Sequence, residues 1–235
     1  LAGMDDSSLF YAWRNDRDEA ALSTLILRHS TGLRQALRRR LSDPAMVDDA
    51  LQTTWIIFSR KAESVRDPTR LISWLHTCAG RIALDLQRAA ARRQFAERAV
   101  HESDSHVMHD SEPYEQDTLR TQLDEALENI SLASREAILR HFLHGQPKAE
   151  AAAILGVSVG AFQMRLDYGI KQLRKKLDQS RRPVTGAILL SLFSADVSAC
   201  ESIPLPNITS ILHPSPRPAA LAEEYAVNLR KVFMK

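Results

Sequence analysis

Apolar side chains recur every three or four positions through the first hundred residues, which is the spacing that places them on one side of a helix. Two breaks, at Ser42-Asp43-Pro44 and Asp67-Pro68, divide this region into successive predicted helices. Proline lacks a backbone donor and fits a first helical turn, so each break ends one helix and begins the next. The three apolar stripes are Leu22, Leu25, Ile26, Leu33 and Leu37, then Val47, Ala50, Leu51, Thr54, Trp55 and Phe58, then Leu71, Leu75, Cys78, Ile82 and Leu86.

Most of the residues away from these stripes are polar or charged. The first helix carries there Arg34, Arg38, Arg39 and Arg40, and the second carries Asp48, Asp49, Gln52, Thr53 and Ile56. The third helix, expected over residues 69–93, presents Arg70, Arg81, Gln87, Arg88, Arg92 and Arg93. Residues 7–98 are therefore predicted to form one packed helical block, with Trp13, Trp55, Phe58, Trp74 and Cys78 as packing residues.

A polar and acidic stretch follows at residues 101–116, without sustained apolar periodicity, and we interpret it as a linker. Its three histidines, His101, His106 and His109, share no helical face, so no metal site is expected. Helical spacing resumes near Thr118, where the apolar stripe consists of Leu119, Leu123, Ala126, Leu127 and Ile130.

The next segment has the spacing of a helix-turn-helix. Ser134 is predicted to cap a helix whose inner residues are Ile138, Leu139, Phe142 and Leu143, and Gly145 ends it. Pro147 opens a short second helix, and Gly156 permits the positive φ of a tight turn. Ser158 then caps a longer helix whose predicted inner stripe is Val159, Phe162, Leu166, Ile170, Leu173 and Leu177. A structural three-helix bundle is the alternative, but it does not explain why the glycine turn and the apolar steps coincide.

The second helix of such a motif enters the major groove of DNA with its N-terminal half. Its predicted outward residues are Gly160, Ala161, Gln163, Met164, Arg165, Asp167 and Tyr168. The small residues permit close approach to the bases, and Gln163 and Arg165 can hydrogen-bond to base edges or phosphates. The basic end supplies Lys171, Arg174, Lys175 and Lys176 for the phosphate backbone.

The remaining residues, 183–235, show a weaker pattern. Residues 184–193 are predicted to form a short apolar helix, and the five prolines between residues 204 and 218 indicate irregular structure. Residues 219–233 again have helical spacing, with Leu221, Tyr225, Val227, Leu229 and Val232 as candidate contacts. This extension is expected either to dock on one of the two domains, or between them, and tune access to partners, or to remain loosely ordered.

Charge supports a nucleic-acid partner. Residues 1–100 carry 16 Lys and Arg against 12 Asp and Glu, and residues 131–182 carry 10 against 4. Residues 101–130 carry only 1 against 9, so an acidic segment lies between two basic blocks. Phosphate contacts supply most non-specific affinity for DNA, which favours DNA binding by the basic blocks. The acidic segment is expected either to stay extended or to lie on a basic face.

Other functional classes find little support. Cys78 and Cys200 make no disulfide framework, so a reduced cytoplasmic location is expected. No signal-peptide core is present, and the longest apolar run, residues 184–195, is shorter than the roughly 17 residues that span a bilayer. No phosphate loop, metal constellation or nucleophile–base arrangement appears, so neither enzymatic activity nor a cofactor is expected.

Three segments together resemble the extracytoplasmic-function sigma factors of the sigma-70 family. LASREAILRHFLHGQPKAEAAAILGVSVGAFQMRLDYGIKQLRKKL is similar to that family's C-terminal promoter-binding domain. VDDALQTTWIIF resembles its polymerase-binding helix, and SWLHTCAGRIALDLQRAAARR resembles its promoter-melting helix. The matches occur in the family's order over residues 7–178. The resemblance implies an all-α fold with residues 1–98 as the region 2 domain, 99–117 as the acidic linker, 118–182 as the region 4 helix-turn-helix domain and 183–235 as an extension.

The resemblance also implies roles for individual residues. Those that match contacts to core RNA polymerase are Asp48, Asp49 and Gln52. Those that match contacts to the minus-ten element are Arg81, Asp85, Arg88, Arg92 and Arg93. Those that match the reading face and phosphate contacts for the minus-thirty-five element are Ser158, Ala161, Gln163, Met164, Arg165, Tyr168, Lys171, Arg174 and Lys175. Residues 61–70 match the loop that captures a flipped base.

The expected partners are therefore core RNA polymerase and promoter DNA, with an anti-sigma factor as a further candidate. Thr53 and Arg81 depart from the family pattern. In the reading helix the departures are Gln163, Met164, Asp167, Tyr168 and Ile170, so the promoter sequence does not transfer from the family. A stand-alone helix-turn-helix regulator is the alternative function. A protein that titrates an anti-sigma partner is a third, weaker possibility.

Overall fold

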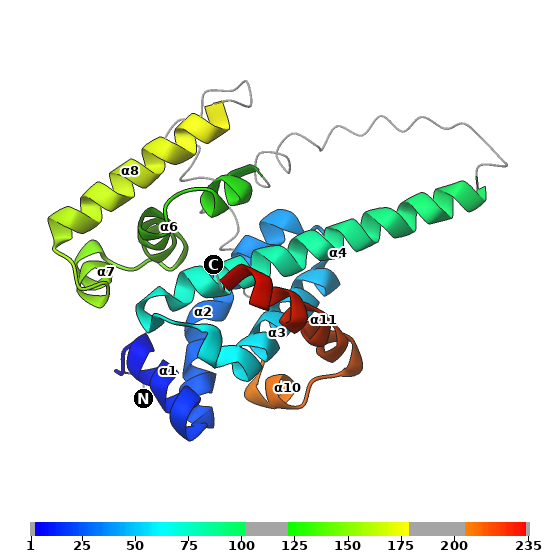
Figure 1. Cartoon of the computed structure of the whole chain (residues 1–235), viewed down its shortest axis with the longest axis horizontal. Coiled ribbons are helices and arrows are strands. Elements are labelled where there is room, and N and C mark those ends of the chain that lie inside the picture. The colour runs from blue at the N-terminus through cyan, green and yellow to red at the C-terminus, as the bar shows by residue number, and fades with distance from the viewer. Residues whose placement is uncertain (1–2, 102–121, 179–204, 234–235) are drawn as a thin grey trace.

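The computed structural model describes residues 3–101, 122–178 and 205–233, and these residues are helical, with no strand among them. Figure 1 shows a lower helical body, a smaller upper body, and the C-terminal helices packed against the lower body. The lower body contains α1 (Asp6–Asp16), α2 (Glu19–Arg40), α3 (Pro44–Lys61) and α4 (Leu71–His101). The upper body contains a helical segment at residues 122–128, α6 (Leu132–Ile138), a π-helical turn (Leu139–Leu143), α7 (Lys148–Ile154) and α8 (Val159–Asp178).

Aspartate side chains begin the helices of the lower body. The Asp43 carboxylate accepts the Ala45 N–H at 2.9 Å, directly before Pro44 at the start of α3. The Asp67 carboxylate accepts the Thr69 N–H at 3.0 Å in the short 3-10 turn (Pro68–Arg70) that leads into α4. Both breaks predicted from the sequence are confirmed. Helix α4, however, continues to His101, beyond the predicted end near residue 93 and into the first residues of the predicted linker. The rest of that linker lies outside the described residues.

Aromatic side chains fill the core of the lower body. Trp55, Phe58 and Trp74 are buried, with ring centroids 5.7 Å apart for the first pair and 5.9 Å apart for the second. The Trp55 indole N–H donates to the Ser30 hydroxyl at 3.0 Å, which satisfies its one buried donor. Cys78 is also buried, and burial raises the pKa of its thiol to about 12. These residues confirm the predicted core.

The predicted outer side of α3 is only partly correct. Thr53 and Ile56 were expected on that side together with Asp48, yet both are fully buried. Helices α2, α4, α10 (Ile208–Leu212) and α11 (Pro216–Phe233) all pack against α3, and residues 53–59 of α3 are buried among them. Thr53 and Ile56 are buried because of long-range packing, which cannot be predicted from the periodicity of a single helix.

The upper body has the predicted helix-turn-helix geometry, with two differences in detail. Gly145 and Gly156 both adopt a φ of 62°, as their turns require. The cap of α6 is Ser131 rather than Ser134, since the Ser131 hydroxyl accepts the Ser134 N–H and Ser134 itself is buried. Val159 is 49% exposed rather than part of the inner stripe of α8, because it occupies the first turn, beyond the reach of α6. The core contains Leu123, Ala126, Leu127, Ile130, Phe162, Leu166, Leu173 and Leu177.

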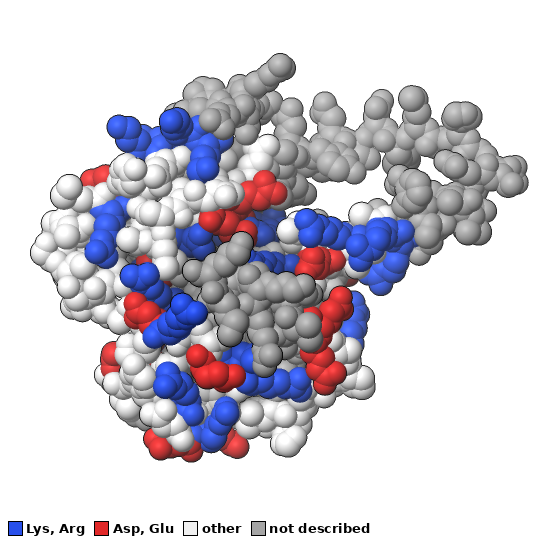
Figure 2. Space-filling model, in the orientation of Figure 1, with Lys and Arg blue, Asp and Glu red and all other residues white. Residues whose placement is uncertain are grey.

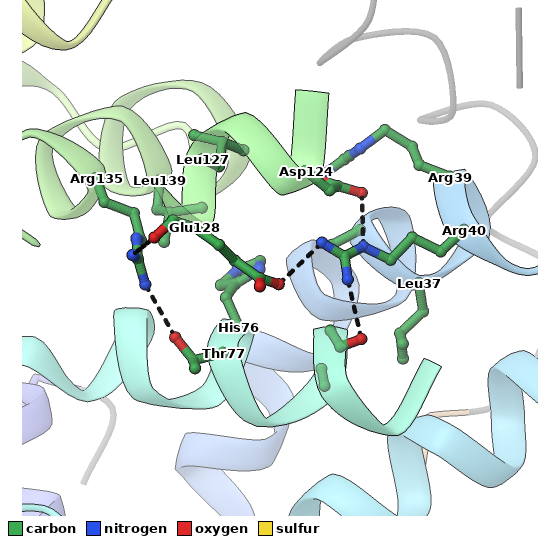
Figure 3. A pocket seen from close by; sticks show the side chains of 13 residues that line it. Leu37, Arg39, Arg40, His76, Thr77, Asp124, Leu127, Glu128, Arg135 and Leu139 are labelled. Carbon is green, nitrogen blue, oxygen red and sulfur yellow. Dashed lines mark hydrogen bonds and ion pairs between the residues drawn. The ribbon is translucent and has the colours of Figure 1, made fainter. Parts of the chain in front are cut away.

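Charged side chains join the two bodies, and acidic and basic residues lie next to one another where they meet (Figure 2). Asp124 of the upper body pairs with Arg39 at 3.1 Å and with Arg40 at 3.2 Å, both from the end of α2. Arg40 also pairs with Glu128 at 3.0 Å and donates to the Gly80 carbonyl at 2.9 Å (Figure 3). Asp124 and Glu128 belong to the acidic segment of residues 101–130. This part of the segment therefore lies on a basic face formed by Arg39 and Arg40, which is one of the two arrangements expected. We call this contact between the bodies the seam.

A second cluster of buried polar groups continues the seam. Glu136 pairs with Arg140 at 2.9 Å and accepts hydrogen bonds from the backbone N–H and the hydroxyl of Ser73 on α4. Arg140 is fully buried and donates to the Thr69 carbonyl at 2.6 Å. Burial of an ion is costly unless it is paired and hydrogen-bonded, so these contacts fix how the upper body docks.

Two glycines let the bodies approach closely. A Cβ at Gly32 of α2 would lie 2.9 Å from the His144 ring, and a Cβ at Gly80 of α4 would lie 2.8 Å from the Glu128 carboxylate. His144 thereby reaches His76 of α4, with 3.2 Å between their Nε2 atoms. Small residues at these positions are thus part of the docking geometry.

The C-terminal extension docks on the lower body. The predicted helix at residues 184–193 lies outside the described residues, and so do the first residues of the proline-rich segment. The expectation of irregular structure there is wrong for α10, whose N-cap Asn207 accepts the Ser210 N–H at 2.8 Å. It is also wrong for the start of α11, where Pro216 and Pro218 occupy the first turn, in which no intrahelical donor is needed. Among the candidate contacts of α11, Tyr225 is buried and Leu221 half-buried.

We predict that Asp124→Ala weakens the seam by about 3 kcal/mol, because it removes the one carboxylate that Arg39 and Arg40 share in a buried site. Glu128→Ala is the matched control, since the Glu128 side chain is 36% exposed and its ion pair should contribute less than about 1 kcal/mol. Small-angle X-ray scattering should show a larger radius of gyration for Asp124→Ala only. Equal effects of the two substitutions would contradict the account.

We also predict that acid weakens the seam. Burial, together with the positive charge of Arg39, lowers the pKa of His76 to about 3, and burial holds the pKa of His144 well below its ordinary value. In the separated state both groups would titrate near their ordinary pKa of about 6.5. As pH falls below that value, the separated state gains protons that the docked state excludes, at up to about 1.4 kcal/mol per pH unit for each histidine.

Scattering between pH 7.5 and pH 5.5 measures this effect as a rise in the radius of gyration. His144→Gln should show a smaller rise than the unsubstituted chain. Burial raises the pKa of Glu136, which acts with the opposite sign, but this carboxyl is present in both proteins and leaves their difference unchanged. Identical pH profiles of the two proteins would show that the histidines do not carry the effect.

Candidate nucleic-acid and polymerase interfaces

The helix-turn-helix presents α8 as a candidate reading helix. The Ser158 hydroxyl accepts the Ala161 N–H at 3.1 Å and so caps α8, as predicted. On the inner side, a Cβ at Gly169 would lie 2.8 Å from Ile138, so glycine lets α8 pack closely on α6. Phe162 and Leu166 anchor the same side in the core. The opposite side of α8 is held outward by this packing.

The outward side of α8 carries both apolar and polar groups. Met164 is 74% exposed and Tyr168 is 56% exposed, while Arg165 is half-buried. Exposed large apolar side chains on a helix that otherwise carries charge fit contact with base edges, for instance with a thymine methyl group. Met164, Arg165 and Tyr168 therefore lie on one accessible side of α8, with the half-buried Gln163 at its edge.

Gln163 and Asp167 form a pair within this face. The Gln163 amide donates to the Asp167 carboxylate at 2.8 Å. This bond occupies one of the two amide donors of Gln163 and orients the amide along the helix. It also partly compensates the negative charge that Asp167 would bring close to phosphates. The sequence placed both residues outward but did not indicate their bond.

The C-terminal half of α8 supplies positive charge. Lys171, Arg174, Lys175 and Lys176 are all exposed, and Figure 2 shows blue side chains gathered at this end of the upper body. Cations near a helix C-terminus are favoured by the helix dipole, and they remain available to phosphates. These side chains are thus accessible to solvent, and their contact with a DNA backbone stays a prediction.

The residues predicted to contact the minus-ten element lie along α4, whose C-terminal half projects beyond the lower body (Figure 1). Arg88, Arg92 and Arg93 are exposed or largely accessible there, and Figure 2 shows basic side chains along this projecting part. Asp85 pairs with Arg88 at 3.3 Å. Arg81 is half-buried close to the seam, so this predicted residue is less accessible than the other arginines.

The three residues predicted to contact polymerase share one side of α3, but they are not open to solvent in the same way. Asp48 pairs with Arg34 at 3.5 Å and keeps 45% of its side chain exposed. Asp49 pairs with Arg217 of α11 at 2.9 Å, and the Gln52 amide donates to the Ser210 carbonyl of α10 at 2.9 Å. Burial raises the pKa of the Asp49 carboxyl, even though Arg217 acts in the opposite direction.

Arg217 and Ser210 are therefore site residues that the sequence did not indicate. Helical spacing at residues 219–233 predicted contacts for Tyr225, and no local pattern indicates which surface the helix covers. Their partners lie more than a hundred residues earlier in the chain.

The described part of the chain contains neither a candidate membrane-spanning helix nor a candidate metal-binding cluster. None of its helices is long and apolar enough to cross a membrane. It contains no cluster of three or more His, Cys, Asp or Glu side chains that could hold a metal ion.

Comparison with known proteins defines the class. The model for Sigma-70 region 2 matches residues 25–93, which span most of α2, all of α3 and most of α4. The model for Sigma-70, region 4 matches residues 120–173, which span the helix-turn-helix. An all-helical protein that carries both regions in this order is a sigma factor of the sigma-70 family.

Two relatives found by sequence, CarQ and SigL, narrow the class further. RNA polymerase sigma factor CarQ of Myxococcus xanthus is 28% identical over 165 residues, covering 70% of this chain and 93% of that protein. ECF RNA polymerase sigma factor SigL of Mycobacterium tuberculosis is 28% identical over 166 residues, covering 69% and 92%. The solved structure of CnrH in complex with the cytosolic domain of CnrY is 26% identical, covers 74% of this chain and 97% of that chain, and has a TM-score of 0.35.

The chain belongs to the extracytoplasmic-function sigma factors of the sigma-70 family. It is accordingly a non-enzymatic subunit that directs RNA polymerase to promoters. The family resemblance found in the sequence is confirmed.

Proposed function

We propose that this sigma factor binds core RNA polymerase through Asp48, Asp49 and Gln52 on α3. Two carboxylates and an amide on one helical side form an acidic surface that complements a basic partner, and such complementarity sets orientation and speeds association. Their common side of α3 is the observation that carries the proposal. Because polymerase and chromosome are its partners, we place the protein in the cytoplasm. An anti-sigma partner stays a prediction.

We further propose that residues 1–98 act as the region 2 domain, residues 118–182 as the region 4 domain and residues 99–117 as the acidic linker between them. In region 2, Arg81, Asp85, Arg88, Arg92 and Arg93 would hold the minus-ten element. Melted bases are held by stacking and positive charge at a cost of a few kcal/mol for unpairing, so no nucleotide hydrolysis is required.

In region 4, the face of α8 would read the minus-thirty-five element. Ser158, Ala161 and Gln163 sit at the N-terminal half that enters the major groove, with Met164, Arg165 and Tyr168 on the same face. Lys171, Arg174 and Lys175 would contact phosphates on either side. The exposure of this face supports the assignment.

The docked arrangement is too compact for both elements at once. The two promoter elements lie about 25 base pairs apart, or roughly 85 Å at 3.4 Å per base pair. Arg93 lies roughly 24 Å along α4 from Thr77, and α8 is roughly 30 Å long at 1.5 Å per residue. Thr77 contacts Arg135 of the upper body at 3.1 Å, so even end to end these lengths fall short of the promoter spacing. Promoter binding therefore requires the seam to open.

Transcription in vitro with purified core RNA polymerase and a promoter library tests the proposal. The full chain should support initiation at a defined subset of promoters, and that subset gives both promoter elements. A stand-alone helix-turn-helix regulator would bind DNA without binding core polymerase. No binding to core polymerase would therefore exclude the proposed function and favour that alternative.

Two variants separate base reading from phosphate contact in the same assay. Arg165→Ala should cost about 1–3 kcal/mol of promoter affinity and relax the preference at one base pair, since a base contact is lost. Lys175→Ala should weaken all promoters about equally and lower the salt dependence by about one counterion. Arg14→Ala, at an exposed arginine of α1 that is assigned to no DNA or polymerase contact, is the comparison variant. A loss of preference with Lys175→Ala and none with Arg165→Ala would reverse the assignment.

A further inference from the structure

The C-terminal helices occupy part of the side of α3 that we assign to polymerase. Arg217 forms an ion pair with the Asp49 carboxylate, and the Ser210 carbonyl accepts a hydrogen bond from the Gln52 amide. Asp49 keeps only 18% of its side chain exposed as a result. A polymerase surface that binds the same two side chains would have to replace both contacts.

Apolar burial holds the extension in place. Ile211 of α10 and Ala222 and Tyr225 of α11 are buried in the same core cluster as Trp55 and Phe58. Ile208, Leu212 and Leu221 are partly buried against that cluster. Burial of apolar surface is the main favourable contribution to such a contact, so the extension is docked on the domain by its core rather than by surface charge.

The same helix also reaches the region assigned to the minus-ten element. Tyr225 of α11 lies beside the Asp85 carboxylate of α4, and its pKa is raised first by burial and then by the negative charge of that carboxylate. Close to Tyr225 on the same helix, Glu223 lies 4.0 Å from Arg60, in a pair in which both side chains are exposed. Helix α11 therefore extends from the polymerase side of α3 to α4.

The extension lies outside the parts of the chain that define the family. The two family matches end at residues 93 and 173, before α10 begins. The aligned parts account for 93% of CarQ and 92% of SigL, which leaves those relatives little chain for an equivalent of α10 and α11. The contact is thus an addition to the sigma fold.

We infer that α10 and α11 are an intramolecular competitor of core RNA polymerase for the Asp49–Gln52 side of α3. This inference rests on the proposed role of Asp49 and Gln52 in polymerase binding. Polymerase binds the fraction of molecules in which the extension has been released, so its apparent dissociation constant is the intrinsic value divided by that fraction. Release of the extension also frees Asp85 for the minus-ten element.

Arg217→Glu in the full chain is the first test. It places a negative charge against Asp49 and leaves every residue assigned to polymerase unchanged. Core polymerase should bind about two- to fivefold more tightly, the range expected from loss of a partly exposed ion pair. Glu223→Gln is the matched control on the same helix, because its pair with Arg60 is long and exposed, and its affinity should not change.

Thiol accessibility of α11 is the second test, and it does not depend on the size of the affinity change. Ala222→Cys, in a chain with Cys200→Ser, places a small thiol at a position that is 1% exposed. The thiol should be protected in the free protein and react once core polymerase is added. The chain with Cys200→Ser alone corrects for Cys78, which is buried.

Two outcomes overturn the inference: unchanged affinity of Arg217→Glu together with a thiol that stays protected in the complex, or a thiol that already reacts in the free chain. Asp48→Asn distinguishes failure of the proposed polymerase site, since Asp48 pairs with Arg34 and not with the extension. If Asp48→Asn weakens polymerase binding while Arg217→Glu and the thiol show no competition, only the inference is wrong. If Asp48→Asn has no effect, the polymerase site itself is wrong.

Discussion

Buried arginines between the two domains determine how this sigma factor is arranged. The side chains of Arg39 and Arg140 are at most 1% exposed. Arg39 pairs with Asp124 of the other domain. Arg140 pairs with Glu136 of its own domain, and Glu136 in turn accepts a hydrogen bond from Ser73 of α4. Taking a guanidinium out of water costs several kcal/mol unless it is paired and hydrogen-bonded. The domains can therefore dock in this register or separate into water, and an intermediate register would leave buried charge uncompensated. This all-or-none character is what makes the seam suitable as a conformational control.

The seam is one closed contact, and the docking of α10 and α11 on α3 is a second. The seam holds the two candidate DNA-binding helices too close together for a promoter, and α11 occupies Asp49 on the assigned polymerase side. Both contacts use side chains or surfaces that the active complex would need. With the proposed site assignments, we interpret the structure as a resting form, in which the cost of opening reduces the affinity for polymerase and DNA. Polymerase binding would supply the free energy to open both contacts.

Local patterns predicted most of the fold, because helix breaks, caps and glycine turns are encoded by neighbouring residues. Gly156 is an example, since its positive φ follows from the turn between two short helices. Predictions failed where distant segments decide the outcome. Ile56 is buried because α3 is enclosed by other helices, and Asp49 is covered because Arg217 arrives from the far end of the chain. The exposed reading face of α8 was predictable for the opposite reason, since only its own apolar stripe determines which side faces outward.

The most direct measurement of the central claim is the separation of the two DNA-binding helices in the free and polymerase-bound states. Dyes attached at Ala91 of α4 and at Glu150 of α7, in the same helix-turn-helix as α8, would report it by fluorescence energy transfer, since both residues are exposed and outside the assigned contacts. The account predicts efficient transfer in the free chain and a marked loss of transfer when core RNA polymerase binds. Transfer that is equally efficient in the complex with polymerase and promoter DNA would contradict it.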